Sequence, residues 1–389
     1  MTDQQTDQPS ADDLIGYRSD DPYPHYAELR EAAGVHELVD DTYLITRHAD
    51  ALAAIRNHRV FSSRGAGLDG MAELSIISQD PPAHTRMRHL VTGPFRPAAI
   101  AALEASIRTM AESLVDDLIE ANRSGAADLV RHLAVPLPVM AIANMMGIPP
   151  DRYEDFRRWS DASVSGRAGL DTDEEETRQA QAEMGAFFLE IIAQRREQPG
   201  DDLISAVLGG DEPLTEMEVL VFCFTLLVAG NETTTNLIGN TMMALLANPD
   251  QMEQLWSDPG LVPSAMEEAL RFDPPAQAIQ RRATEPVVVD GTEIPAEAAV
   301  VILLAAANRD PRHFDEPDRF DVTRNPRDHL SFGHGIHLCL GAGLARLEAR
   351  VAYETLIQRV ADIRPAGPVE RQLGQLRGIR KLPITLTER

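Results

Sequence analysis

The stretch FGHGIHLCLG, residues 332–341, places one cysteine among glycines immediately before a helical pattern. Hydrophobic residues recur at helical spacing from this point: Leu340, Leu344, Leu347 and Val351. The sulfur of Cys339 is therefore predicted to lie where the unpaired N–H groups of a first helical turn stabilise a thiolate. Three glycines allow either a positive φ or the close approach of a flat, bulky group: Gly333, Gly335 and Gly341.

A thiolate in this position is a ligand, a nucleophile or an inert core sulfur, and a lone cysteine is most often simply buried. A nucleophile needs a base within reach, but in an extended segment His337 would point to the side opposite Cys339. Zinc needs several ligands, and no second cysteine lies nearby. A single thiolate with glycine clearance suits the axial position of a haem iron. These residues alone leave both a ligand and a buried sulfur open.

Composition and charge restrict the class of protein. The chain has 389 residues, 43% of them hydrophobic, and a net charge of −25, which argues against binding to nucleic acid or to an anionic membrane. Residues 1–16 are polar and acidic, and we predict a disordered tail there without a signal peptide. Cys223 and Cys339 lie too far apart for a disulfide framework, which fits a cytoplasmic location. The longest apolar run, residues 219–230, is shorter than a bilayer span and predicts a buried helix.

Helical periodicity dominates the chain, so the predicted fold class is mainly α with a smaller β region. Helices are expected at residues 23–33, 49–57, 98–122, 138–146, from 152 onward, 174–198 and 215–247. Strands are expected as a hairpin within 35–46 and at 287–289 and 300–304, with an Asp290-Gly291 turn. Residues 308–326 have many turn residues and are expected to form a coil leading into the cysteine loop.

The segment SQDPPAHTRMRHL, residues 78–90, begins a predicted helix with Asp80 as its N-cap and prolines in the opening positions. His84 and Arg88 fall one turn apart on one face of this helix. The two side chains could hold an anion, but taken alone they are better explained as a solvated basic face.

The segment LLVAGNETTTNLIGN, residues 226–240, brings a carboxyl and several hydroxyls into an apolar helix. Gly230 and the three threonines that follow Glu232 are expected to distort the helix locally. An acid beside an alcohol can relay protons to a bound oxidant. Threonines that bond back to helix carbonyls explain the same residues, and for this stretch by itself that is the better explanation.

The segment MEEALRFDPPAQ, residues 266–277, places Glu268 and Arg271 on one helix face, an ordinary surface pair if considered alone. Together the segments resemble the cytochrome P-450 superfamily of haem-thiolate monooxygenases, in particular its soluble bacterial members. FGHGIHLCLG matches the haem-binding loop, EALR the Glu-x-x-Arg motif, AGNETT the oxygen-activation helix and PDRF the meander. The resemblance extends from about Tyr17 to the C-terminus and implies one domain at 17–389, a large helical bundle around haem with a small β-sheet lobe.

The resemblance implies a role for each matched residue. Cys339 is the expected iron ligand, with Phe332 packed beside the porphyrin. Four residues match positions that bind the haem propionates: His84, Arg88, Arg281 and His337. A structural triad is expected from Glu268, Arg271 and Arg319. Glu232 and Thr233 match the acid–alcohol pair, Gly230 the dioxygen site, and Thr234 the alternative alcohol.

The resemblance also implies haem b as cofactor, O2 as co-substrate, no bound flavin or nucleotide, and a monomer that does not bind a membrane. Electrons are expected from a ferredoxin or flavodoxin with a separate NAD(P)H-dependent reductase, docked on Arg86, Arg346 and Arg350. A monooxygenase that inserts oxygen into a C–H or C=C bond is expected. The alternatives are a peroxide-driven peroxygenase and a non-catalytic haem-binding sensor or carrier.

The matched substrate-recognition regions are largely apolar and predict a hydrophobic small molecule. The expected contacts are Leu68, Ile77, Thr225, Val228, Ala276 and Ala278. Asn231 is expected to offer a hydrogen bond to substrate or solvent. Residues 159–170 could form a mobile cover over the site.

Overall fold

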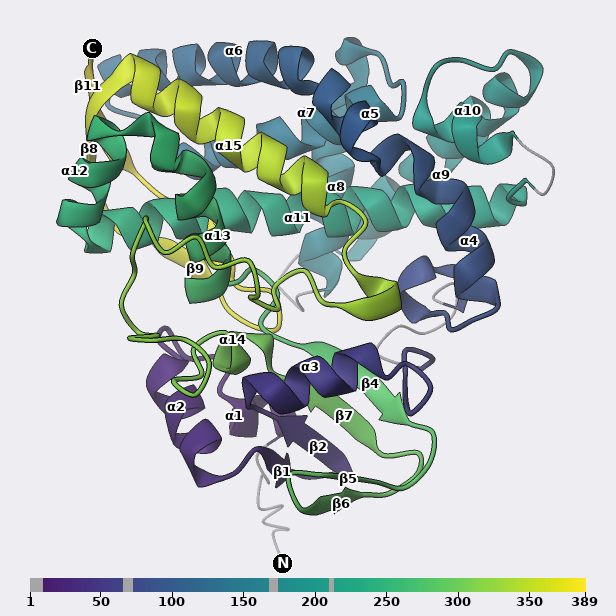
Figure 1. The fold of residues 1–389 in the computed structure, drawn as a ribbon. Coiled ribbons are helices and arrows are strands. Elements are labelled where there is room, and N and C mark those ends of the chain that lie inside the picture. Colours follow the sequence, from purple (N-terminus) through teal and green to yellow (C-terminus); the bar gives the residue numbers. More distant parts are fainter. Residues whose placement is uncertain (1–9, 66–72, 168–173, 210–212) are drawn as a thin grey trace, which may run out of the picture.

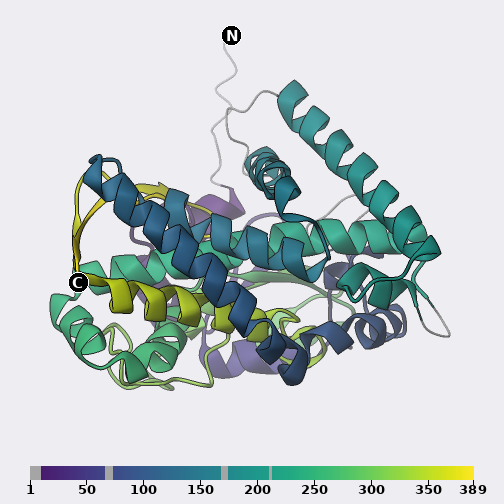
Figure 2. The ribbon, with the colours of Figure 1, turned by 90° about the horizontal axis from the view of Figure 1, so that it is seen from above.

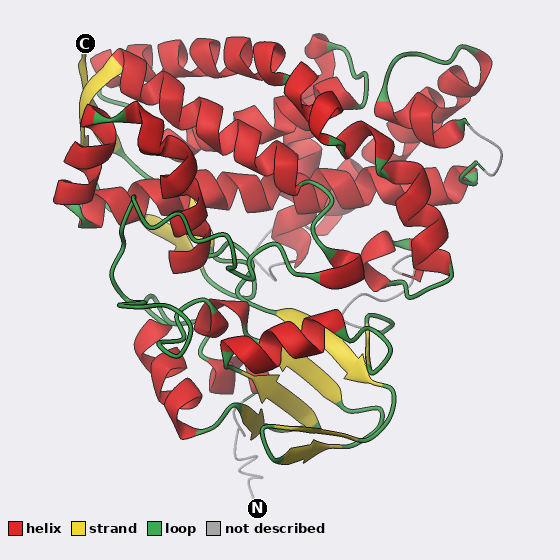
Figure 3. Ribbon diagram, in the orientation of Figure 1, coloured by secondary structure: helices red, strands yellow, loops and turns green. Residues whose placement is uncertain are grey.

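The computed structural model describes residues 10–65, 73–167, 174–209 and 213–389. It consists of a large helical part and a smaller lobe that holds a sheet (Figures 1 and 3). The mainly α fold class with a smaller β region is therefore confirmed.

The helices begin and end close to the residues predicted from periodicity, although the helix expected at 98–122 is divided at Leu103. In chain order they are α1 (Ala11–Ile15), α2 (Tyr23–Ala32), α3 (His48–Arg56), α4 (Ala83–Val91), α5 (Pro97–Ala102), α6 (Glu104–Arg123), α7 (Pro136–Met145), α8 (Tyr153–Arg167), α9 (Glu174–Glu197), α10 (Leu203–Leu208), α11 (Glu216–Ala247), α12 (Pro249–Ser257), α13 (Val262–Phe272), α14 (Leu304–Ala307) and α15 (Ala342–Arg359).

The sheet of the smaller lobe has five strands in the order β1-β2-β7-β4-β3. Its members are β1 (Val35–Glu37), β2 (Thr42–Ile45), β3 (Phe61–Ser62), β4 (Ile279–Ala283) and β7 (Ala299–Ile302). The predicted hairpin is β1–β2, and β2 then pairs in parallel with β7, which joins two distant parts of the chain. Three two-stranded sheets complete the set: β5 (Val287–Val289) with β6 (Thr292–Ile294), β8 (Val360–Pro365) with β11 (Ile384–Glu388), and β9 (Glu370–Gln372) with β10 (Gly378–Lys381).

The central element of the helical part is α11, which contacts α7, α8, α9, α13 and α15. It begins in a capping box, since the Thr215 hydroxyl accepts from the N–H of Glu218 while the Glu218 carboxylate accepts from the N–H of Thr215 at 2.8 Å. By length and hydropathy α11 could cross a membrane, but half of its apolar window is buried inside the protein, as in a core helix. Both ribbon views show α6 alongside α15 on the same side of this core (Figures 1 and 2).

The chain before the first predicted helix is partly ordered. Residues 1–9 of the predicted disordered tail lie outside the described residues. At residues 10–16 the prediction is wrong, because α1 is capped by Ser10 and buries Ile15 against Tyr26 and Leu44. Burial of one large apolar side chain is worth about 2 kcal/mol, which helps to order this short helix.

Candidate active site

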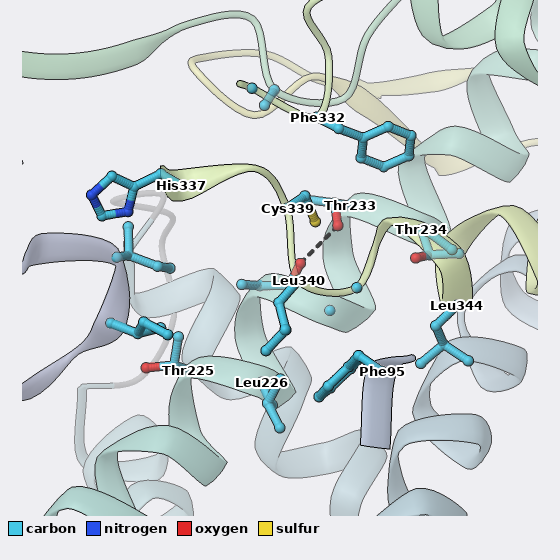
Figure 4. A pocket seen from close by; sticks show the side chains of 18 of the residues that line it. Phe95, Thr225, Leu226, Thr233, Thr234, Phe332, His337, Cys339, Leu340 and Leu344 are labelled. Atoms are coloured by element: carbon cyan, nitrogen blue, oxygen red, sulfur yellow. Dashed lines mark hydrogen bonds between the residues drawn. The ribbon is translucent and has the colours of Figure 1, made fainter. Parts of the chain in front are cut away.

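A cavity of about 340 Å³ lies between α11 and the loop that precedes α15 (Figure 4). This volume is within the range of small-molecule sites, about 300–1,000 Å³. Most of its wall is hydrophobic, with side chains that include Ile76, Ile142, Met145, Phe222, Leu226 and Ile279. An apolar wall of this kind excludes water and strengthens any electrostatic interaction inside it.

Cys339 faces this cavity from the loop before α15 (Figure 4). The loop closes on itself because the N–H of Cys339 donates to the carbonyl of Phe332 at 2.9 Å. Cys339 is exposed only towards this cavity, whose walls keep bulk water from the thiol and so raise its pKa, while the backbone N–H groups of Gly341 and Ala342 and the charge of Arg88 partly offset that rise. The N–H groups at the start of α15 thus favour the thiolate, as predicted, but the loss of bulk water outweighs them, and a bound metal cation would complete the deprotonation.

The three glycines of this loop differ in backbone conformation and in the space around them. Gly333 and Gly335 have φ values of +65° and +66°, which a side chain disfavours. Gly341 has an ordinary φ of −82°, but a Cβ placed there would meet nothing within 4 Å. The backbone at Gly341 is therefore open to the close approach of a bulky group.

His337 does not lie on the opposite side from the cysteine. Gly335–His337 forms a 3₁₀ turn, and both His337 and Cys339 line the cavity, so the predicted opposite orientation is wrong. It would be wrong for an extended segment too, because residues two apart in a strand share one face. The Nε2 of His337 lies 3.0 Å from the hydroxyl of Ser63, and its ring centroid is 4.3 Å from that of His84. Burial and the charge of Arg281 lower the pKa of His337 to about 3, so this imidazole is a poor base for a thiol.

Four basic side chains gather at one end of the cavity: His84, Arg88, Arg281 and His337. Nε2 of His84 is buried without a hydrogen-bond partner in the described residues. Arg88 and Arg281 donate to the carbonyls of Leu338 and Gln280, at 2.7 and 2.6 Å, and neither pairs with a described carboxylate. Burial lowers the pKa of Arg281 to about 10, which leaves it charged at neutral pH. Such an excess of unpaired donors suits an anion with several oxygens.

The acid nearest to this basic cluster is Asp80, whose predicted role is wrong. Pro82 occupies the N-cap of α4 and makes no side-chain capping bond. The carboxylate of Asp80 instead accepts from the hydroxyl of Ser62 at 2.5 Å and from the N–H of Ser63 at 3.1 Å. Asp80 thereby holds the segment that carries Ser63 against His337.

The polar stretch of α11 faces two directions. Gly230, Thr233 and Thr234 line the cavity, whereas Glu232 is buried outside its wall and accepts from the side-chain amide of Gln372. The hydroxyl of Thr233 donates to the carbonyl of Ala229 at 2.7 Å and faces the cavity (Figure 4). The helix is unbroken here, so the predicted distortion is absent.

Neighbouring positions on α11 serve packing. A Cβ at Gly230 would lie 2.4 Å from Cδ1 of Ile142, so a side chain there would require the end of Ile142 on α7 to move. Asn231 is buried and donates to the hydroxyl of Ser160 at 3.2 Å. Because that bond turns its side chain towards α8, the prediction that Asn231 contacts the substrate is not supported by its position.

Glu268 and Arg271 are completely buried and form a two-pronged ion pair at 2.7 and 2.8 Å. Arg271 also donates to carbonyls of the coil that leads to the cysteine loop: those of Asn308, Pro317 and Arg319. The side chain of Arg319 points to solvent, towards Glu316, so its predicted side-chain contact with the pair is wrong. Arg324 makes that contact, at 3.2 Å from Oε1 of Glu268. No periodicity marks Arg324 in the sequence, because it lies in an irregular coil.

Only some of the predicted substrate contacts line the cavity. Ile77, Thr225 and Ala276 line the cavity, as predicted. Val228 and Ala278 are buried elsewhere, so their prediction is wrong; Ala278 packs in the core that contains Ile15. Leu68 lies outside the described residues, as does part of the predicted cover at 159–170. Its first residue, Trp159, packs among Phe156 and Phe187 and does not line the cavity.

Comparison with known proteins places this site in a family. Residues 260–366 match the family model Cytochrome P450. The chain is 39% identical to the cytochrome P450 monooxygenase PikC of Streptomyces venezuelae, over 94% of this chain and 91% of that protein. This chain belongs to the cytochrome P450 family. It is accordingly an oxidoreductase of the monooxygenase type, and the family uses haem iron and dioxygen.

Two further P450 relatives support the family membership and the fold. The vitamin D(3) 25-hydroxylase of Pseudonocardia autotrophica is 36% identical over 95% of this chain and 94% of that protein. A crystal structure of the P450 CYP109E1 from Bacillus megaterium, in complex with testosterone, has a TM-score of 0.85 at 35% identity and covers 94% of this chain and 99% of that one. The fold described above is therefore the P450 fold.

Proposed function

We propose that this P450 inserts one oxygen atom from dioxygen into a C–H or C=C bond of a hydrophobic small molecule, with haem b as its cofactor. One observation carries the proposal: a cysteine that faces an apolar cavity shares it with four basic side chains that lack an anion. A haem has an iron that the cysteine could bind and two carboxylates that the basic side chains could hold. The residues present therefore fit this group.

In this assignment Cys339 binds the iron, and the propionates accept from His84, Arg88, Arg281 and His337. The open space at Gly341 and the ring of Phe332 would border the macrocycle. A haem held there supplies an iron at which dioxygen is activated with two electrons and two protons. The protein contributes the thiolate, a dry cavity and proton delivery.

The proton donors proposed for this chemistry are Thr233 and Glu232. Thr233 gives its own proton to the carbonyl of Ala229, so its oxygen is free to accept a hydrogen bond from a group in the cavity. Glu232 lies behind the cavity wall and is held by Gln372. It therefore has to exchange Gln372 for water or Thr233 before it can hand over a proton. Gly230 lines the cavity at this turn, where dioxygen would be accommodated.

The substrate class follows from the wall of the cavity. Thr225 adds little polarity to it, since its hydroxyl is already bonded to the carbonyl of Val221 at 2.8 Å and lies 3.2 Å from the hydroxyl of Ser75. Ile77 and Ala276 add apolar surface. An apolar molecule with few polar groups fits this wall, and the testosterone bound to the relative CYP109E1 belongs to that class.

The electron donor is proposed to be a ferredoxin or flavodoxin served by an NAD(P)H-dependent reductase. The three arginines expected to form its docking site are each paired with carboxylates: Arg86 with Glu218, Arg346 with Glu267, and Arg350 with Glu104 and Glu354. Arg56 has no such partner among the described residues, and it lies 3.3 Å from the ring of His334 on the cysteine loop. Arg56 and His334, beside the exposed Leu338, are the better docking candidates for an acidic donor.

The first experiment tests the thiolate. Cys339→Ser is expected to abolish the Soret band that characterises a reduced, thiolate-ligated haem with carbon monoxide, because serine supplies no thiolate. Cys223→Ser is the matched control, since Cys223 is buried in the helical core and does not line the cavity. An unchanged band in Cys339→Ser would refute the assignment.

The second experiment identifies the oxidant. Turnover of testosterone and related steroids is measured with dioxygen, a ferredoxin and its reductase, and separately with hydrogen peroxide alone. The proposal expects product in the first reaction, in which the acid and alcohol of α11 have a use. Product only with peroxide would instead support a peroxygenase. Haem binding without product under either condition, across a broad screen of apolar compounds, would support a non-catalytic carrier.

A further inference from the structure

A second carboxylate of α13, Glu267, lies beside the cysteine loop. Glu267 is 8% exposed and accepts from Nε and Nη2 of Arg346 on α15, at 2.6 and 2.9 Å. Its Oε2 also lies 3.1 Å from Nε2 of His329, in the coil before the loop. Nδ1 of His329 accepts from the N–H of Ser331 at 3.2 Å, so the ring proton is on Nε2 and is donated to Glu267. One carboxylate thus holds two side chains from distant parts of the chain.

Both of these side chains border the ring of Phe332. The guanidinium carbon of Arg346 lies 4.4 Å from the centroid of that ring, and the ring of His329 lies 5.8 Å away at a tilt of 47°. Phe332 in turn lines the cavity with Cys339, and its carbonyl accepts from the N–H of Cys339 at 2.9 Å. Glu267 therefore acts on the cysteine loop through Arg346 and His329, although it does not line the cavity itself.

Glu267 and Arg346 bring one charge of each sign to this loop. Burial disfavours the anion of Glu267, but the hydrogen bonds from His329 and Arg346 and the charge of Arg346 outweigh it and lower the pKa of Glu267 to about 2. Against the burial that raises the pKa of the Cys339 thiol, the charge of Arg346 acts to lower it, so the field of this guanidinium reaches the sulfur. The carboxylate of Glu267 offsets part of that field.

Glu267 has a different place from its neighbour Glu268, the carboxylate of the Glu-x-x-Arg motif. Successive helix residues point about 100° apart, so Glu268 meets the coil at Arg324 while Glu267 meets Arg346 on α15. A buried carboxylate in an ion pair adds little net stability, since the cost of removing it from water offsets its attraction to the cation. The pair is therefore better explained by its effect on the loop than by a gain in stability.

We propose that Glu267 is a positioning residue that sets the charge beside the thiolate: it holds Arg346 against Phe332, offsets the guanidinium charge there, and so lowers the reduction potential of the bound haem. The inference rests on the proposed haem site at Cys339. Reduction by one electron from the external donor adds negative charge on the cavity side of this loop. A nearby cation favours the reduced state and a nearby anion disfavours it. Glu267 therefore opposes reduction, and Arg346 favours it.

The test is the midpoint potential of the haem-loaded protein, measured by redox titration of its absorbance without substrate or redox partner. Glu267→Gln keeps a hydrogen-bond acceptor for Arg346 but leaves the guanidinium charge unopposed, so the potential should rise. The expected change is about tenfold in the equilibrium between the oxidised and reduced states at low salt, which is about 59 mV for one electron. Because the side chain of Arg346 is 42% exposed, this shift should shrink as salt is added.

Variants of Arg346 test the sign of the effect. Arg346→Gln should lower the potential, because it removes the cation and leaves the anion. Arg346→Lys keeps the charge and should restore a potential close to that of the wild type. The double variant Glu267→Gln/Arg346→Gln should lie between the two single variants.

Glu354→Gln is the matched control. It removes the same charge from another ion pair of α15, but Glu354 accepts from Arg108 and Arg350, at 2.7 and 3.0 Å, and none of these three residues lines the cavity. Its potential should equal that of the wild type. The Soret band of the reduced protein with carbon monoxide is recorded for every variant, because all of them retain the thiolate of Cys339.

The results separate the two levels of the proposal. Absence of the thiolate-type Soret band in the wild-type protein would refute the haem site itself. With that band present, equal potentials for the wild type and Glu267→Gln would refute the role of Glu267 alone. Shifts of the same sign in Glu267→Gln and Arg346→Gln would also refute it, because a distorted loop, and not charge, would then explain both. If Glu267→Gln does not bind haem, Arg346→Gln and Arg346→Lys still decide the question: an unchanged potential in Arg346→Gln, or no restoration by lysine, overturns the proposal.

Discussion

Arg324→Ala is expected to destabilise this P450 more than Arg319→Ala, although the PDRF match points to Arg319. The side chain of Arg324 is 17% exposed and bonds Glu268, a completely buried carboxylate, at 3.2 Å. It also donates to the carbonyls of Asp315 and Glu316 at 2.6 and 3.2 Å. Glu268 keeps Arg271 when Arg324 is removed, so the loss is smaller than that of a broken buried pair. The lost charge-assisted bonds correspond to about 2–3 kcal/mol.

Arg319→Ala is the matched control, because it removes the same charge from the same coil. Its side chain is 56% exposed and pairs with Glu316 and Asp321 at the surface, where such pairs contribute about 0–1 kcal/mol. The contribution of Arg319 to the buried cluster comes from its backbone carbonyl, which accepts from Arg271 and is retained in alanine. The expected difference between the two variants is therefore about 2 kcal/mol.

The assay is urea unfolding of the haem-loaded protein, followed in parallel by far-ultraviolet circular dichroism and haem absorbance. Unfolding free energies are compared at equal m-values. The haem signal should be lost at lower urea in Arg324→Ala, because the coil anchored by Glu268 leads into the loop that carries Cys339. Equal destabilisation by the two variants, or a larger effect of Arg319→Ala, would refute this account of the triad.

Three other variants test the described packing. Glu348→Gln should gain stability relative to wild type as pH rises above about 4.5, by up to about 1.4 kcal/mol per pH unit. The reason is that burial raises the pKa of Glu348, which makes the folded wild-type protein lose stability as pH rises, whereas glutamine does not titrate. A constant difference in unfolding free energy between the two proteins across pH 5 to 8 would contradict this. Gly378→Ala should lower the free energy of unfolding by about 2–3 kcal/mol in the same assay. The new Cβ would lie 1.9 Å from Oδ1 of Asn236 and 2.8 Å from the Cβ of Asn236, so rotation of the asparagine side chain cannot relieve the clash. A cost near zero would show that β10 and α11 separate easily at this contact. Asn231→Ala should lower stability by about 1 kcal/mol through the lost bond to Ser160 and leave the spectral shift caused by substrate unchanged; a large change in substrate affinity would place Asn231 at the substrate after all.

Local signals were enough for the elements that depend on a few consecutive residues. The helix start after Cys339, the start of α11 near residue 215 and the β1–β2 hairpin each follow from contacts between residues close in the chain. The fold class follows from the period of the apolar residues over the whole chain. These features agree between sequence and structure because their hydrogen bonds are formed within one segment.

The orientation of individual side chains could not be obtained in this way. Successive residues of a helix point about 100° apart, so a shift of one position separates Glu232, outside the cavity, from Thr233, inside it. Val228 and Asn231 are predicted to contact the substrate, yet neither lines the cavity, and Asn231 donates to Ser160 of α8. Only the neighbours of α11 determine which of its faces borders the cavity.

The sequence by itself determined the family, the cysteine at its centre and the helix that crosses the cavity, because each is encoded in a short segment with its own spacing. The tertiary structure decided which distant residues meet. It brought Arg324, and not the side chain of Arg319, to Glu268, and it placed Glu348 against Thr234 across two helices. Burial removed water from these groups, so each needed a partner, and the partner came from whichever part of the chain the packing brought near.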